Sequence, residues 1–206
     1  MKILALELSS ARGSLAWLDG DRDPVVREWS NDRKHSGEFF ENLQTVTNEF
    51  GRAEQIIVGL GPGSYAGVRI AIAAAVGLGI AWNAPLAGFP SICAIESTTD
   101  DYVVIGDARR QSFFWAHIRG RDLSDGPTLF TEAELKEKLD KLENSMPLFS
   151  PKELPQFPRA IIGHPSALVL AQIAQANKRC FAMPPLEPIY LRDPHITIPK
   201  AATLVL

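Results

Sequence analysis

The sequence lacks the residue patterns that mark several classes of protein. Only two of its 206 residues are cysteines, and both lie in apolar settings, which favours buried reduced thiols over a disulfide framework. Its four histidines are scattered without an H-x-x-x-H or H-E-x-x-H spacing, so we expect no metal site. The segment GPGSYAG around Ser64 does not fit the G-x-S-x-G elbow, which argues against a Ser–His–acid hydrolase.

Net charge and long apolar runs are also limited. The chain has 21 Lys and Arg against 24 Asp and Glu, so it lacks the basic excess of a protein that holds nucleic acid alone. The N-terminal apolar run is interrupted by Glu7, too early for a signal peptide. The longest weakly polar run, 68–82, contains Arg69 and falls short of the roughly 20 residues that span a bilayer. We therefore expect a soluble, cytoplasmic protein that does not contact a membrane and that meets nucleic acid only through a partner.

Hydrophobic patterning predicts an α/β chain with a composition shift near residue 100. We expect a compact first lobe at 1–100 and a smaller, looser second lobe at 101–206. The expected strands cover 2–8, 14–19, 24–30, 55–60, 84–89, 102–108, 111–118 and 159–164. The expected helices cover 36–50 with Ser36 as N-cap, 66–82, a short helix at 91–97, 131–144 and 165–177. The segment 184–206 is broken by prolines and is expected to be extended.

The stretch GPGSYA, residues 61–66, fits the dinucleotide-binding pattern G-x-G-x-x-G/A between an expected strand and helix. Two observations count against a cofactor loop. Pro62 removes an N–H from the turn, and the first acidic residue downstream, Glu96, is too distant to hold a ribose. The Walker pattern fails because no lysine follows the glycines. We therefore expect no cofactor, although exposed N–H groups at this turn could bind an anion weakly.

The helix expected at 66–82 carries a small residue at every fourth position, namely Gly67, Ala71, Ala75 and Gly79. Glycine inside a helix costs about 1 kcal/mol relative to alanine, so close backbone approach is the expected compensation. We expect the larger residues to face the chain's own sheet: Val68, Ile72, Val76 and Ile80. In that orientation the small stripe would be exposed, and a helix of another chain could pack against it. Packing of the stripe within this chain is the alternative.

Two turns remain open to more than one interpretation. The hairpin LELSSARGSLAW places Glu7 at the position from which a carboxylate could serve a phosphate loop, although an ordinary hairpin is favoured. The turn DARR, 107–110, combines an acid with two arginines. It is either a solvated turn or a contact for an anion or a partner surface.

Several segments together resemble the TsaB (YeaZ-like) family of bacterial tRNA threonylcarbamoyladenosine biosynthesis proteins. They cover most of 1–118 and return at 187–192: ILALELSS, KHSGEFFENL, VGLGPGSYAGVRIAIAAAVGLGIAW, PLAGFPSICAI, GDARRQSFFWA and PIYLR. The resemblance implies a two-lobed actin/Hsp70/sugar-kinase-like (ASKHA) fold with a reduced second lobe and no working catalytic site. It further implies a noncatalytic partner of a TsaD-type transferase, assisted by a TsaE-type ATPase, that forms a homodimer when alone and meets tRNA only within the complex.

The family's pairing surface lies on the helices of the first lobe. Carried onto this sequence, it predicts a partner interface at Gly67, Arg69, Ile70, Ala71, Ala74, Ala75, Val76, Leu78, Gly79, Trp82, Phe39, Phe40 and Leu43. A vestigial phosphate loop is expected at Glu7, Ser9, Ser10, Gly61, Gly63 and Ser64. The chain departs from the family at Glu7, where an aspartate is usual, which weakens a catalytic use of that loop. The alternative function is an active small ASKHA-type kinase or a peptidase.

Overall fold

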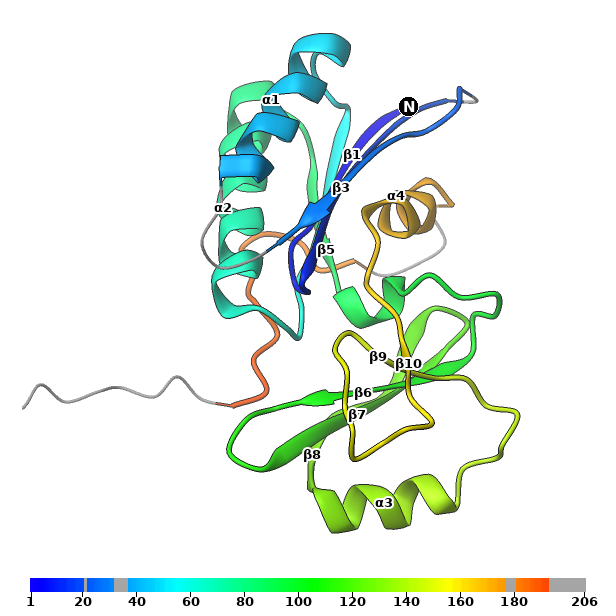
Figure 1. Cartoon of the computed structure of the whole chain (residues 1–206). Coiled ribbons are helices and arrows are strands. Elements are labelled where there is room, and N and C mark those ends of the chain that lie inside the picture. Colours follow the sequence, from blue (N-terminus) through cyan, green and yellow to red (C-terminus); the bar gives the residue numbers. More distant parts are fainter. Residues whose placement is uncertain (21, 32–36, 177–180, 193–206) are drawn as a thin grey trace, which may run out of the picture.

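The computed structural model describes residues 1–20, 22–31, 37–176 and 181–192, which form two α/β lobes, one above the other in Figure 1. Each lobe is built on a five-stranded sheet. The expected N-cap Ser36, Cys180 and the end of the proline-rich segment lie outside the described residues.

The first sheet has the strand order β3-β2-β1-β4-β5. Its first three strands form an antiparallel meander, and β4 and β5 are added parallel to β1. The strands are β1 Lys2–Glu7, β2 Arg12–Asp19, β3 Val25–Ser30, β4 Gln55–Gly59 and β5 Leu86–Phe89. The helices around this sheet are α1 Gly37–Phe50, α2 Tyr65–Trp82 and α4 Ala167–Gln175, with the 3-10 turn η1 Ser91–Ala94.

Alternation along β1 explains how the helices are distributed over the two faces of this sheet. Leu4 and Leu6 pack into one core with residues of α1 and α2. Ile3 and Ala5 point to the opposite face and pack into a second core with α4 and η1. The sheet is therefore covered on both faces, with α1 and α2 side by side on one of them (Figure 1).

The second sheet repeats the connectivity of the first in a reduced form. Its order is β10-β9-β6-β7-β8, again with three antiparallel strands followed by two parallel ones. The elements are β6 Tyr102–Asp107, β7 Ser112–Arg119, β8 Asp122–Thr131, β9 Leu148–Ser150, β10 Ile161–Ile162 and α3 Glu132–Asp140. The matching strand order indicates that the two lobes are copies of one topology, and the last two strands of the second copy are only three and two residues long.

The end of the described chain packs against the first lobe. Helix α4 lies on β1, β2 and β4. Further along, the backbone of Ala182 pairs with that of Gly88 on the edge strand β5, with N···O distances of 2.8 and 2.9 Å. The N–H of Ile189 donates to the carbonyl of Leu60 at 2.8 Å. The division of the chain into domains at residue 100 stays a prediction. Although they follow residue 100, α4 and the segment after 181 pack against the first sheet rather than the second.

Candidate functional site

Helix α2 packs most of its small stripe against its own sheet, which is the alternative interpretation given above. The favoured orientation of this helix is therefore wrong, except at Val68, which is buried as expected. Gly67, Ala71 and Ala75 are buried, whereas Ile80, which we expected to face the sheet, is 79% exposed. A Cβ atom added at Gly67 would lie 2.1 Å from the carbonyl oxygen of Leu8, directly after β1. Only glycine allows the first turn of α2 to approach the backbone that closely.

The outward face of α2 is almost entirely apolar. Its exposed residues are Tyr65, Ala66, Arg69, Ala73, Val76, Gly77, Ile80 and Ala81. Arg69 is the one charged residue of the helix. On the neighbouring helix α1, Phe40 is 50% exposed. We call the exposed residues of α2 together with Phe40 the helical face.

The predicted interface residues divide between this helical face and the core. Five of them are buried within the chain: Phe39, Leu43, Gly67, Ala71 and Ala75. The others are exposed or half-buried: Phe40, Arg69, Ile70, Ala74, Val76, Leu78, Gly79 and Trp82. Contact with a partner stays a prediction for this second group.

Helix α2 is also long and apolar enough, by length and composition alone, to cross a membrane. It has 18 residues with a mean hydropathy of 1.6. Its buried side packs on the first sheet in the same core as β1 and β4. The expectation that this chain does not contact a membrane stays a prediction.

The residues of the predicted phosphate loop are brought together, but the carboxylate among them is inaccessible. The N–H of Ser64 donates to the carbonyl of Ser9 at 2.6 Å, which holds the loop before α2 against the β1–β2 hairpin. Glu7 is fully buried, and its Oε1 accepts a hydrogen bond from the N–H of Ser9 at 2.6 Å. Burial raises the pKa of Glu7, and the hydrogen bonds from Ser9 only partly oppose this rise. Gly59 makes room for the side chain, because a Cβ there would lie 1.8 Å from Glu7 Oε2.

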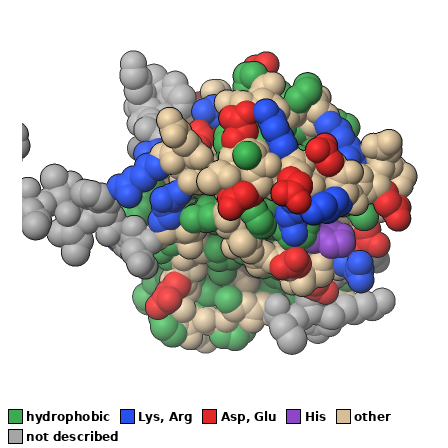
Figure 2. All heavy atoms as spheres, turned by 90° about the horizontal axis from the view of Figure 1, so that it is seen from below, with side chains coloured by type: hydrophobic (Ala, Val, Ile, Leu, Met, Phe, Trp, Pro, Cys, Tyr) green, Lys and Arg blue, Asp and Glu red, His purple; other side chains and the backbone are tan. Residues whose placement is uncertain are grey.

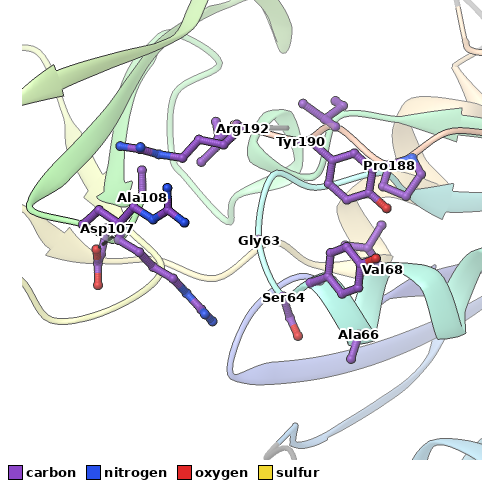
Figure 3. A pocket seen from close by; sticks show the side chains of 14 residues that line it. Gly63, Ser64, Ala66, Val68, Asp107, Ala108, Pro188, Tyr190 and Arg192 are labelled. Atoms are coloured by element: carbon purple, nitrogen blue, oxygen red, sulfur yellow. Dashed lines mark hydrogen bonds between the residues drawn. The ribbon is translucent and has the colours of Figure 1, made fainter. Parts of the chain in front are cut away.

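A cleft of about 750 Å³ opens between the two lobes beside this loop (Figure 3). Three segments far apart in the sequence line it: the start of α2 from Gly63 to Val68, the β6–β7 turn 107–110, and residues 188–192. Gly63 and Ser64 are the members of the predicted phosphate loop that line it, whereas Glu7, Ser9, Ser10 and Gly61 do not. The DARR turn and the PIYLR segment are far apart in the sequence, and no local pattern indicates that they meet.

The β6–β7 turn that borders the cleft has an uncommon backbone. Arg109, Arg110 and Gln111 all adopt positive φ, at 61°, 52° and 58°. Asp107 stabilises the turn, since its Oδ1 accepts the N–H of Arg109 at 2.7 Å. Within the described ranges, no group of three or more His, Cys, Asp or Glu side chains could hold a metal ion.

The duplicated strand order and the cleft between the lobes define a two-lobed α/β protein of the actin/Hsp70/ASKHA type, as expected. The family model of TsaD, tRNA N6-adenosine threonylcarbamoyltransferase, matches residues 32–184. The chain therefore belongs to the TsaD family, and the predicted resemblance to its YeaZ-like members is confirmed.

Two solved structures from Pseudomonas aeruginosa share this fold. One is described as an uncharacterized protein with similarity to peptidase YeaZ, with a TM-score of 0.69 and 22% identity over 93% of this chain and 99% of the other. The second, YeaZ, has a TM-score of 0.68 and 22% identity over 92% of this chain and 99% of the other.

Curated relatives match a shorter part of the chain. An uncharacterized protein from Mycobacterium leprae is 38% identical over 77 residues, which are 37% of this chain and 21% of the relative. One from Mycobacterium tuberculosis is 34% identical over 83 residues, which are 40% of this chain and 39% of the relative. The match thus spans well under two thirds of the length of either relative.

Proposed function

We propose that this chain is a noncatalytic subunit that binds and supports a TsaD-type transferase. In this role it contributes to threonylcarbamoylation of the tRNA adenosine next to the anticodon, together with a TsaE-type ATPase. Membership of the TsaD family and the fold shared with YeaZ support a place in this machinery. The tRNA is bound by the assembled complex rather than by this chain alone, in keeping with the net charge of −3.

The helical face is the observation that carries this proposal. Val76 and Ile80 project from α2 among exposed small residues, Ala73, Gly77 and Ala81. Small residues let a second helix approach closely, and full burial of an isoleucine side chain contributes about 1.5–3 kcal/mol. The partner is therefore a helix of the transferase that packs along α2 and α1. In the absence of the transferase, a second copy of this chain covers the same face.

A single charge on the helical face tests this proposal. The variant Ile80→Asp places a carboxylate where the partner helix packs, and we expect it to weaken the complex with the transferase at least tenfold. Ile162→Asp is the matched control, because Ile162 is 56% exposed on the edge strand β10 of the other lobe. Size-exclusion chromatography with light scattering measures the mass of each mixture. Equal complex formation by wild type and Ile80→Asp would sink the proposal.

The same variants separate a supporting role from an activity of the isolated chain. In a reconstituted reaction with the transferase and the ATPase, modified tRNA should depend on this chain and should fall with Ile80→Asp but not with Ile162→Asp. The kinase or peptidase alternative requires ATP or peptide turnover by this chain alone. Turnover of that kind, unaffected by the transferase, would contradict the noncatalytic role.

A further inference from the structure

Arg69 lies within the stripe of α2 that a second helix would cover. This stripe consists of exposed residues, namely Ala66, Arg69, Ala73, Val76 and Ile80. They follow one another at steps of three, four, three and four residues, which is the spacing of the a and d positions along the seam of a coiled coil. A helix packed along this seam would therefore cover Arg69 together with Val76 and Ile80.

The charge of Arg69 is isolated on this helix. Helix α2 contains no acidic residue and no second basic one, and Arg69 forms no ion pair with another described residue. The side of the molecule on which α3 lies is different, because there acidic and basic side chains lie next to one another (Figure 2). Two such pairs lie within α3, Glu132–Lys136 and Glu137–Lys141. Arg69 is thus not part of a mixed, solvated surface of that kind.

Two tyrosines hold the guanidinium group of Arg69 near the start of α2. Its Nη1 donates to Tyr65 Oη one turn earlier, and its guanidinium carbon lies 4.9 Å from the centroid of the Tyr65 ring. Tyr65 in turn stacks on Tyr190, with ring centroids 5.6 Å apart and an interplanar angle of 29°. The hydrogen bond to Tyr65 uses one N–H of the guanidinium, so the group is held in place and can still donate to a carboxylate.

Covering such a charge is unfavourable unless the partner supplies the opposite one. A guanidinium that a packed helix removes from water loses its hydration, and a carboxylate with good hydrogen-bond geometry is needed to compensate. In coiled coils, a single polar or charged residue in the seam fixes the register and the choice of partner at some cost in stability. Arg69 is placed to have the same effect on the helical face.

A second copy of this chain cannot supply the carboxylate from α2. In a symmetric pair both copies contribute the same helix, and α2 holds no Asp or Glu. The acidic residues of α1 are Glu38, Glu41 and Glu49. At about 3.6 residues per turn, Glu38 and Glu49 lie on the side of α1 opposite Phe40, away from the helical face. Glu41 is the remaining candidate, and the experiment below includes it.

We propose that the transferase helix carries an Asp or Glu opposite Arg69, and that this ion pair directs the helical face to the transferase rather than to a second copy. The inference rests on the proposed function, because it names the chemistry of the partner at the same face. The carboxylate lies over the first turns of α2, since the Arg69 guanidinium points back to Tyr65. Val76 and Ile80 provide the apolar part of the contact.

The variant Arg69→Met tests this ion pair, because it removes the charge and keeps an unbranched side chain that suits a helix. Its effects on the two kinds of complex should have opposite signs. The Kd for the transferase, measured by titration calorimetry, should rise at least tenfold, because the partner carboxylate is left unpaired. The Kd for self-association, measured by analytical ultracentrifugation, should fall severalfold, because no charge has to be covered.

Three further measurements support the assignment. Arg69→Lys keeps the charge but not the planar fork, so it should bind the transferase more tightly than Arg69→Met and less tightly than wild type. The control Arg119→Met removes an exposed arginine of the second lobe and should leave both Kd values unchanged. Among Asp→Asn and Glu→Gln variants of the transferase, one should weaken binding to wild type but not to Arg69→Met. If no variant shows this coupling, the ion pair is excluded.

Ile80→Asp separates this inference from the proposed function, because the apolar contact is common to both complexes. If Ile80→Asp leaves the transferase bound, the proposed function itself fails. If Ile80→Asp weakens that complex but Arg69→Met binds as tightly as wild type or more tightly, the proposed function stands and the ion pair is overturned. Weaker self-association of both Arg69→Met and Glu41→Gln would show that a second copy supplies the carboxylate, which also overturns the proposal.

Discussion

Alanine substitutions at two glycines of α2 test whether its small face is needed inside this chain. At Gly67, a Cβ atom would lie 2.1 Å from the carbonyl oxygen of Leu8. An ordinary carbon–oxygen contact is about 3.3 Å, so the helix would have to move by roughly 1 Å from the end of β1. Overpacking of this kind costs about 3 kcal/mol when the neighbour is backbone, and the better helix propensity of alanine offsets about 1 kcal/mol. We expect Gly67→Ala to lower the free energy of unfolding by about 2 kcal/mol.

Gly77 provides the matched control in the same helix. It is exposed, and nothing lies within 4 Å of a Cβ atom built there. Gly77→Ala should therefore gain the propensity difference alone and raise the free energy of unfolding by about 1 kcal/mol. The two variants should differ by roughly 3 kcal/mol, or about 6–12 °C in Tm for a chain of this size.

Urea denaturation followed by circular dichroism measures both variants of the isolated chain. If the small stripe served a contact between chains, both alanines would stabilise the isolated protein and Gly67→Ala would affect only the complex. Equal stabilisation by the two substitutions would therefore refute the internal packing of α2. The chromatography of the complex then shows a separate effect: Gly77→Ala adds a methyl group to the helical face and should weaken partner binding without loss of stability.

Two further substitutions concern buried polar groups. Because burial raises the pKa of Glu7, its contribution to stability is present below the unfolded value near 4.5 and is lost as pH rises through the folded pKa. Above pH 4.5, urea denaturation should show wild type losing up to about 1.4 kcal/mol per pH unit relative to Glu7→Gln until the folded pKa is passed, and parallel pH profiles would contradict the raised pKa. Ser14 Oγ accepts the N–H of Ala167 at 2.9 Å in the core, so Ser14→Ala should cost about 1–3 kcal/mol by leaving that N–H unpaired. The exposed control Ser145→Ala should stay within about 0.5 kcal/mol of wild type, and equal stability of the two serine variants would exclude this role for Ser14.

Local pattern predicted most elements of the fold because each has a clear period. The short apolar segments of β1–β3, separated by tight turns, and the helical spacing of α1 are properties of single segments, and the structure confirms them. Strands β8 and β9 were missed for a local reason. The first contains Asp122, Asp125 and Gly126–Pro127 and lies at the edge of its sheet, where proline is tolerated. The second has only three residues within a proline-rich segment.

The orientation of α2 could not be predicted because both of its sides are apolar. Its composition shows a small side and a large side, and we assigned the large one to the sheet, as is common for a helix on a sheet. The short distance between α2 and the end of β1 instead determines which side of the helix faces the sheet. That distance depends on the loop before α2, where the N–H of Ser64 donates to the carbonyl of Ser9. The cleft could not be predicted from the sequence for a related reason. Its walls, 107–110 and 188–192, are some eighty residues apart in the chain.

The orientation of α2 links the packing of the first lobe to its surface. A helix whose small residues lie against the sheet must present its larger residues outward, and here these are Val76 and Ile80. The glycine at 67 that permits close contact with the sheet is thus also responsible for the apolar helical face. A bulky residue at 67 would move the whole first turn, which carries Tyr65 at the cleft, as well as the helical face. Stability and partner binding would then both respond to a bulky residue at 67, whereas Ile80→Asp should affect only partner binding.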